Sequence, residues 1–203
     1  MRFSIIIPAH NTEKYIRKTL ESIKMQEFTD YELIVVCDSC TDETEHIARE
    51  YTDKVYTVNY CKDGLTRNKG LAAATGEYIL FMDSDDWWIH EFALTMIDSA
   101  LKDREEDIDI LAFGFIWMTR GYCGPISHST PSRQYLYSNV WSKCWKRSFL
   151  YKNNISFRDI YPHSDMYFVS DAQKATDKIY SFDHALYYYN YLRDGSITKS
   201  LKE

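Results

Sequence analysis

The sequence has no excess of positive charge, no long hydrophobic run and no paired set of cysteines. Asp and Glu number 30 against 24 Lys and Arg, so the net charge of -6 argues against nucleic-acid binding through bulk electrostatics. No apolar stretch is as long as a bilayer span, and the one at the N-terminus is too short for a signal peptide. Five scattered cysteines indicate reduced thiols. We therefore expect a cytoplasmic protein without a transmembrane segment, which leaves peripheral attachment to the inner face of the membrane open.

The residues that are present suit a globular protein with a real core. Hydrophobic residues make up 45% and charged residues 27% of the 203 residues, so we expect one domain over residues 1–203. Aromatic content is high at 16%, with 17 Tyr and 5 Trp, and much of it follows Trp117. Two explanations stay open: a core rich in Tyr, and a cleft that stacks on sugars or other amphipathic ligands.

Short apolar runs alternate with helical patterns in the first half of the chain. This rhythm predicts repeated βα units and a largely parallel sheet. The predicted strands are Phe3–Ile7, Glu32–Cys37, Lys54–Val58 and Tyr78–Met82, and the predicted helices are Thr12–Met25, Thr41–Tyr51 and Leu65–Ala74. We expect Gly76 to terminate the third helix as its C-cap.

The rhythm changes after Asp86. A turn-rich segment at residues 120–133 predicts a loop, either an ordinary surface loop or one that moves over a site. The other expected elements are a helix at Glu91–Leu101, a strand at Ile108–Phe115, helices at Val140–Asn153 and Asp165–Ala175, and a strand at Leu186–Tyr191.

Polar residues follow three of the predicted parallel strands, at the sheet edge where open α/β sheets bind ligands. They lie at Pro8–Glu13, at Asp38-Ser39 and at Asp83–Asp86. The carboxylates of Asp83 and Asp85, spaced at i and i+2, can share a hard cation that bridges two phosphates. The alternative is that Asp85 or Asp86 caps a helix.

Successive motifs resemble those of family 2 glycosyltransferases with the GT-A fold. The order and spacing match in Ser4–Ile16, Leu33–Asp42, Arg67–Ile79 and Asp83–Asp86, and the likeness continues at 141–150 and 193–198. The resemblance implies a Rossmann-like α/β fold with a mostly parallel central sheet and flanking helices. A nucleotide-sugar and metal half at residues 1–100 would precede an acceptor and catalytic-base half at 101–203.

The resemblance also implies roles for single residues in the nucleotide half. Asp38 would hydrogen-bond the base, most naturally a uracil imide. Arg67 would grip the diphosphate. Asp83, with Ser84, would contact the ribose, and Asp85, with Asp83, would bind Mn²⁺ or Mg²⁺. The remaining residues, which would line the base and ribose pocket, are Pro8, Ala9, His10 and Glu13.

In the second half, the resemblance makes Asp165 the catalytic base at the start of a helix. A helix N-terminus favours the ionised form that a base requires. Without the resemblance, a simple N-cap role explains Ser164 or Asp165. His163 would flank the acceptor or touch the metal. Trp141, Lys143 and the C-terminal aromatic residues would help shape the acceptor side, although a packed helix face explains Trp141 and Trp145 equally well.

The function implied is an inverting transfer, in one displacement, from a nucleotide-diphosphate sugar to an acceptor hydroxyl. The donor would be a UDP-sugar and the acceptor a saccharide or lipid-linked saccharide, in cell-surface polysaccharide or glycan synthesis. Two alternatives keep the fold: a non-catalytic nucleotide-sugar binding module and a metal-dependent nucleotidyltransferase. The segment Cys37-Asp38-Ser39-Cys40 replaces the family's acidic-acidic-Gly-Ser run and creates a Cys-x-x-Cys spacing, which could instead be a redox or half-zinc motif.

Overall fold

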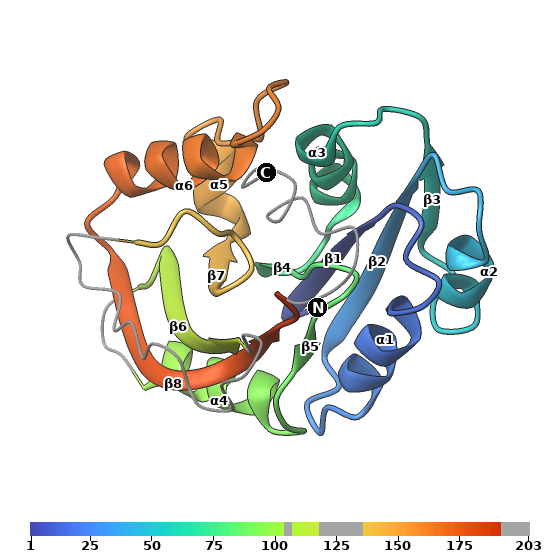
Figure 1. Cartoon of the computed structure of the whole chain (residues 1–203). Helices are drawn as coiled ribbons and strands as arrows, with labels where there is room; N and C mark the ends of the chain where they lie inside the picture. The colour runs from blue at the N-terminus through green and yellow to red at the C-terminus, as the bar shows by residue number, and fades with distance from the viewer. Residues whose placement is uncertain (104–106, 118–135, 192–203) are drawn as a thin grey trace.

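The computed structural model describes residues 1–103, 107–117 and 136–191. Eight strands form one sheet in the order β3-β2-β1-β4-β7-β6-β8-β5, and helices flank it (Figure 1). This arrangement confirms the expected α/β class with a mostly parallel central sheet. No helix in the described ranges has the length and apolar character needed to cross a membrane.

The first half is a run of βα units, as the alternating pattern predicts. Strand β1 pairs in parallel with both β2 and β4, and β2 pairs in parallel with β3. Every residue of β1 is buried because helices cover both faces of the sheet there. The elements of this half are β1 (Phe3–Ala9), α1 (Ile16–Lys24), β2 (Tyr31–Asp38), α2 (Thr44–Arg49), β3 (Val55–Val58), α3 (Asp63–Ala73) and β4 (Tyr78–Phe81).

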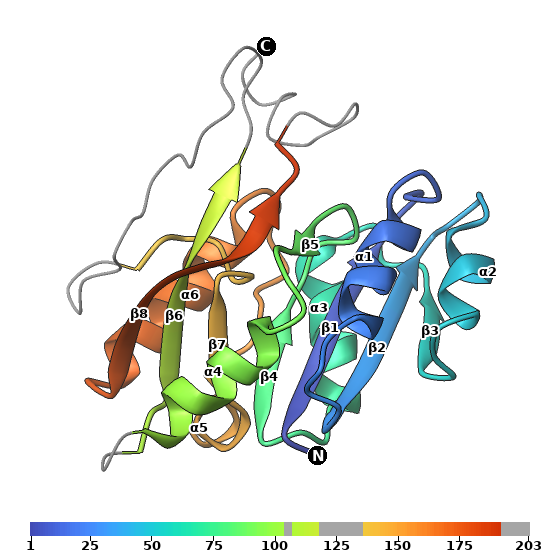
Figure 2. The same ribbon diagram turned by 90° about the horizontal axis from the view of Figure 1, so that it is seen from below.

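The second half extends the same sheet beyond β4. Strand β7 runs antiparallel to both β4 and β6, and β8 runs parallel to β6. Figure 2 shows the neighbouring β6 and β8 beyond β7, with their arrowheads at the same end. The elements of this half are β5 (Trp87–Trp88), α4 (Ala93–Lys102), β6 (Ile110–Trp117), β7 (Lys143–Lys146), α5 (Arg147–Lys152), α6 (Ser164–Ala175) and β8 (Ile179–Tyr189).

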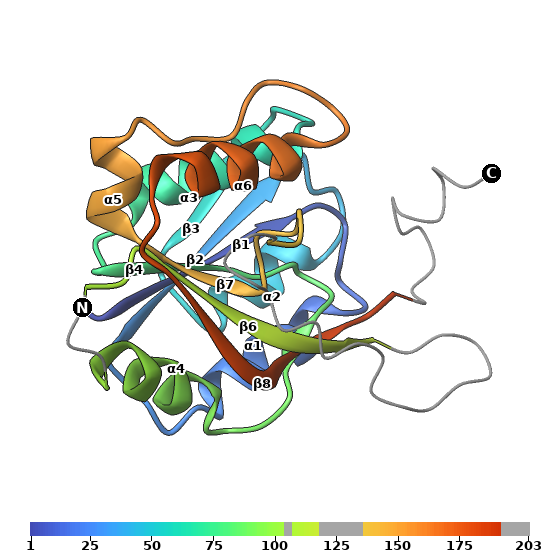
Figure 3. The ribbon, with the colours of Figure 1, turned by 90° about the vertical axis from the view of Figure 1, so that its left-hand side faces the viewer.

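Two apolar clusters lie on opposite faces of the sheet. Alternate side chains of a strand point to opposite faces, so Ile5 and Ile7 belong to the cluster that includes α1 and α4. Ile6 lies between them in sequence and belongs to the cluster that includes α3, α5 and α6. Figure 3 shows these two groups of helices on either side of the sheet.

The helix predicted at Val140–Asn153 is wrong over its first part. Residues 143–146 form β7, a central strand, and the helix α5 begins only at Arg147. Cys144 packs in one apolar cluster and Trp145 in the other, which is the two-residue period of a strand. A short apolar stretch does not distinguish the two periods by itself.

The role predicted for Gly76 is also wrong. Helix α3 ends at Ala73, and Ala74 already has an extended backbone. A Cβ atom at Gly76 would lie 2.6 Å from the backbone nitrogen of Ser4, so the glycine permits a close approach of the bend before β4 to the backbone of β1. Strand β5 was not predicted, and the last strand, β8, begins before Leu186. The loop predicted at 120–133 and the motif at 193–198 lie outside the described residues.

Glu32 is a buried carboxylate that ties three segments together at the edge where β1 begins. It accepts hydrogen bonds from the Ser4 hydroxyl, from the backbone and side chain of Thr75, and from the backbone of Gly76, and it pairs with Lys54. Burial raises its pKa, but the hydrogen bonds from Lys54, Ser4 and Thr75 outweigh burial and lower the pKa to about 2. The charged form therefore stabilises the fold.

We predict that Glu32→Gln lowers the free energy of unfolding at pH 7 by about 1–3 kcal/mol, because a neutral amide with one acceptor cannot replace this carboxylate. The folded-state pKa lies below the unfolded value, so the contribution is complete above the ordinary Glu pKa and is lost as the pH falls towards about 2. Urea unfolding at several pH values measures the difference. Glu27→Gln, at an exposed position, is the control. A constant difference between wild type and Glu32→Gln down to pH 2 would contradict this assignment.

Candidate functional site

A cleft of about 960 Å³ lies at the carboxyl ends of β1, β2 and β4, and both halves of the chain line it. This is the edge where an open parallel sheet is expected to bind ligands. Glu13 is not among the lining residues, and its carboxylate instead accepts a hydrogen bond from the backbone of Glu43. The other site residues predicted from sequence all line the cleft: Pro8, Ala9, His10, Asp38, Arg67, Asp83, Ser84, Asp85, His163 and Asp165.

Asp38 organises the turn that follows β3. Its carboxylate accepts hydrogen bonds from the backbone N–H groups of residues 60, 61 and 62 and from the hydroxyls of Ser39 and Thr66. Against burial, which raises the pKa, these hydrogen bonds keep the pKa of Asp38 below its usual value. The carboxylate thus has a structural task in addition to any contact with a base.

His10 lies at the rim of the same end of the cleft. Its Nδ1 donates to the backbone oxygen of Asp38 over 2.6 Å, because a carbonyl can only accept. This bond fixes the ring beside the end of β2.

Arg67 is the centre of the charged part of the cleft. Its side chain is 3% exposed, and its guanidinium donates to Asp63 and, over 2.6 Å, to Asp83. The Phe157 ring lies 5.7 Å from the guanidinium carbon. Asp63 precedes Arg67 by one helical turn on α3, a spacing that brings the two side chains together. Sequence reasoning had missed Asp63 and Phe157.

Asp165 approaches this group from α6. Its Oδ1 lies 3.6 Å from an Arg67 nitrogen, which makes an ion pair but no hydrogen bond. Burial raises the pKa of Asp165 to about 7, although Arg67 acts to lower it. Helix α6 begins at Ser164 and has no side-chain cap, so the alternative that Ser164 or Asp165 is an N-cap is wrong.

Two buried atoms of this cluster have no hydrogen-bond partner within the described part of the chain. They are Nε of Arg67, a donor, and Oδ1 of Asp165, an acceptor. Buried polar atoms are rarely left unpaired, because each costs the desolvation that its missing bond would offset. Asp165 Oδ1 is enclosed beside Arg67 while the Asp165 side chain as a whole is 25% exposed, so the part of this carboxylate that a ligand can reach is its other oxygen.

Asp85 and Asp86 have different surroundings although they are neighbours. Asp86 is fully buried and accepts hydrogen bonds from the Tyr187 hydroxyl and from the backbone of Asn190. Burial, together with the charges of Asp85 and Asp83, raises the pKa of Asp86 well above its usual value. Neither residue caps a helix, since β5 follows directly and α4 begins at Ala93. Asp85 instead faces the cleft.

In the described ranges, no group of three or more His, Cys, Asp or Glu side chains is arranged to hold a metal ion. A divalent cation that binds a diphosphate needs fewer, because Mg²⁺ is typically held by one or two carboxylates together with substrate phosphates. Asp85 and Asp83 offer carboxylates in the cleft, and oxygen is the ligand that such a cation prefers. The donor set therefore fits a cation that is shared with a ligand.

The Cys-x-x-Cys segment lies where β2 ends, beside the cleft. Cys37 is a buried residue of β2, and Cys40 is half-buried and donates to the backbone oxygen of Ala9. Cys40 precedes α2 by several residues, so the pair does not begin a helix as it would in a thioredoxin-like motif. A hydrogen bond from Cys37 lowers the pKa of Cys40 to about 7.

The other wall of the cleft is aromatic. Trp141 lines this wall, whereas Lys143, the other residue predicted for the acceptor side, is buried and is not among the lining residues. Burial lowers the pKa of Lys143 to about 7, against the opposing charge of Asp165. The lining residues of this wall are Phe115, Trp117, Ser138, Asn139, Trp141 and Tyr189.

Comparisons with known proteins agree on the family. A model of the family described as Glycosyl transferase family 2 matches residues 4–175. The chain is 30% identical to the poly(ribitol-phosphate) beta-N-acetylglucosaminyltransferase TarS of Staphylococcus aureus, over 96% of this chain and 36% of TarS. It is 33% identical to a poly(ribitol-phosphate) beta-glucosyltransferase of Bacillus spizizenii, over 96% of this chain and 33% of that protein. The chain thus spans about a third of the length of these relatives.

The fold is shared with a solved relative. The crystal structure of S. aureus TarS residues 1–349 in complex with UDP-GlcNAc matches with a TM-score of 0.86 at 28% identity. The match covers 98% of this chain and 61% of that one. The expected GT-A fold is thereby confirmed.

We predict that Asp38→Ala accelerates amide hydrogen exchange at residues 60–62 by about tenfold or more, because three N–H groups lose their acceptor. Exchange measured by mass spectrometry reports this directly. Thr66→Val is the graded control, since it removes one hydrogen bond of the carboxylate. Unchanged exchange at 60–62, together with lost nucleotide binding, would assign Asp38 to the nucleotide alone.

Proposed function

The chain belongs to glycosyl transferase family 2, and on that basis we propose that it transfers a sugar from a nucleoside-diphosphate sugar to an acceptor hydroxyl. The observation that carries the proposal is that Arg67 and Asp165 line the same cleft and lie 3.6 Å apart. Arg67 offers a donor suited to a diphosphate oxygen, and Asp165 offers an acceptor suited to a hydroxyl. Residues 1–203 would act as one domain, since both halves line the one cleft.

The donor is proposed to be a UDP-sugar, held at the carboxyl ends of β1, β2 and β4. Support comes from the TarS complex with UDP-GlcNAc, which has the same fold. His10 and the turn held by Asp38 would border the base. Asp83 and Ser84 would reach the ribose, and the Arg67 guanidinium would hold the diphosphate.

A divalent cation, Mn²⁺ or Mg²⁺, fits beside Asp85 and Asp83. When bound, such a cation neutralises charge on the leaving diphosphate. Arg67 would also neutralise charge on the diphosphate. Asp63 fixes its guanidinium in place, so the group needs no rearrangement to meet an anion.

The reaction is proposed as one displacement with inversion. The acceptor oxygen forms a bond to the anomeric carbon, the bond from that carbon to the diphosphate oxygen breaks, and Asp165 takes the proton of the acceptor hydroxyl. Asp165 lines the cleft and its side chain is 25% exposed, so that hydroxyl can reach the exposed part of the carboxylate. Burial, which raises the pKa of this carboxyl to about 7, makes it a stronger base than an exposed Asp.

Product analysis tests the proposal against its alternatives. Incubation with UDP-sugars and Mn²⁺ should release UDP. A nucleotidyltransferase would release pyrophosphate, and a binding module would bind the donor without turnover. A thermal-shift screen of nucleotide sugars with and without Mn²⁺ identifies the donor first. Pyrophosphate as the product, or no thermal shift with any nucleotide sugar, would overturn the proposal.

We predict that Asp165→Asn lowers the rate of transfer by at least about 100-fold while the donor dissociation constant stays nearly unchanged. The amide keeps the volume but cannot take the proton, and general bases typically contribute about 100-fold to 10,000-fold. Single-turnover kinetics and calorimetry on one preparation separate the two quantities. Asp171→Asn on the same helix is the control, because Asp171 forms an exposed ion pair with Arg158. Near-normal transfer by Asp165→Asn would remove Asp165 from the chemistry.

We also predict that UDP binding requires a divalent cation and weakens by at least about tenfold in Asp85→Ala. Substituting the residues that hydrogen-bond to metal ligands typically alters metal affinity by about 10–100-fold. Asp85 would be a ligand itself, so we expect at least the lower value. Titration calorimetry with Mn²⁺, and with a chelator in its place, measures both effects. Equal affinities for wild type, Asp85→Ala and the chelated protein would exclude the proposed cation.

A further inference from the structure

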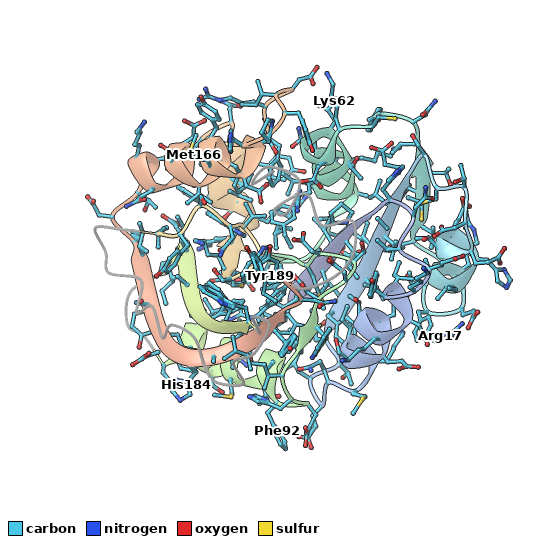
Figure 4. The ribbon with its side chains drawn as sticks, viewed as in Figure 1. Arg17, Lys62, Phe92, Met166, His184 and Tyr189 are labelled. Carbon is cyan, nitrogen blue, oxygen red and sulfur yellow. The ribbon has the colours of Figure 1, made fainter. Side chains whose placement is uncertain are left out.

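The ends of β6 and β8 build a wall that the chemistry of the donor does not use. The two strands are parallel neighbours, and Trp117 pairs with Tyr189 at their last residues. Both side chains are half-buried and line the cleft. Figure 4 labels Tyr189 near the middle of the molecule.

Packing behind these rings fixes their positions. Trp141 stacks on Tyr189 at 5.1 Å and on Tyr187 at 4.6 Å between ring centroids. Phe115 meets the Trp141 ring edge-on at 4.7 Å and lies 5.4 Å from Trp117. Aromatic faces that are already held in place lose little conformational entropy when a ligand binds on them.

Asn139 adds one oriented polar group to this wall. Its Oδ1 accepts hydrogen bonds from the Ser142 hydroxyl at 2.5 Å and from Lys143 Nζ at 3.1 Å, and Lys143 also donates to its backbone oxygen at 2.6 Å. Because both neighbours donate, the oxygen of the amide faces them and the NH₂ group is on the other side. Asn139 lines the cleft, so the amide can donate to a ligand there.

We propose that Trp117, Tyr189 and Asn139 form an acceptor subsite for an uncharged pyranose ring. A pyranose presents an apolar C–H face to an aromatic ring and hydroxyls to a donor such as an amide. The faces of aromatic rings carry partial negative charge, which disfavours a phosphate.

This inference rests on the proposed function and narrows its acceptor. The two curated relatives described above are named for poly(ribitol phosphate), an open-chain polyol with a phosphate in every unit. The aromatic wall suits a ring sugar better than such a chain. A neutral saccharide is therefore the acceptor class that this subsite selects.

The first test measures binding without turnover. Saturation-transfer NMR with methyl β-cellobioside, in the presence of UDP and the diamagnetic Mg²⁺, should show transfer to the C–H protons of a pyranose ring. Trp117→Leu should abolish it, and Trp117→Phe, which keeps an aromatic face, should retain it. Trp87→Leu is the matched control, because Trp87 stacks on Tyr188 and does not line the cleft. Equal saturation in Trp117→Leu and wild type would overturn the subsite.

The second test measures transfer. The value of kcat/KM, measured through UDP release, should be at least about tenfold higher for methyl β-cellobioside than for poly(ribitol phosphate). Trp117→Leu should raise the KM for the saccharide about tenfold, the loss of a ring contact worth about 1.4 kcal/mol, and leave the donor dissociation constant unchanged. A higher kcat/KM for poly(ribitol phosphate) would overturn the inference about the acceptor and leave the proposed function standing. If no donor gives UDP release, the proposed function is contradicted instead. The NMR result would still show whether the subsite binds a pyranose.

Discussion

A guanidinium in the interior of a protein needs carboxylates around it, and Arg67 takes them from three parts of the fold. Asp63 lies on its own helix, Asp83 follows β4 and Asp165 comes from α6. Removing one partner of such a group leaves an uncompensated buried charge, so the three segments hold one another in place. The positions of the β4 exit and of the α6 start therefore depend on one side chain. A long-range ionic contact of this kind joins the two halves of the chain at the cleft.

The same contact leaves two buried atoms without a hydrogen bond in the described part of the chain. The two terminal nitrogens of Arg67 donate to Asp63 and Asp83, and its Nε has no hydrogen-bond partner within the described residues. Asp165 is near enough for Coulomb attraction but not for a hydrogen bond. The side chain of Asp165 is 25% exposed, so under the proposed function an acceptor hydroxyl meets the exposed part of the carboxylate while Oδ1 stays beside Arg67.

The sequence predicted the parallel half well because each βα unit is local. Residues after β1, β2 and β4 meet at one edge for a topological reason, so their shared cleft could be anticipated. The strand β7 could not, since its two-residue period only has meaning between β4 and β6. Arg67 and Asp165 are 98 positions apart, and no local pattern links them. The residue roles taken from the family resemblance stay predictions.

The many aromatic residues gather in two places, the apolar core and the wall of the cleft. The direction of strand β7 explains the second place. Phe81, Phe157 and Phe168 pack together in the apolar cluster beneath α6, as a core rich in aromatics would. Because β7 is antiparallel to both β4 and β6, β6 runs in the direction of β4, and β8 follows β6. The carboxyl ends of β6 and β8 therefore reach the same edge as those of β1 and β4, which brings Trp117 and Tyr189 to the cleft. Were β7 absent and β6 paired antiparallel to β4, these rings would lie at the opposite edge of the sheet. The aromatic wall is thus a consequence of strand direction.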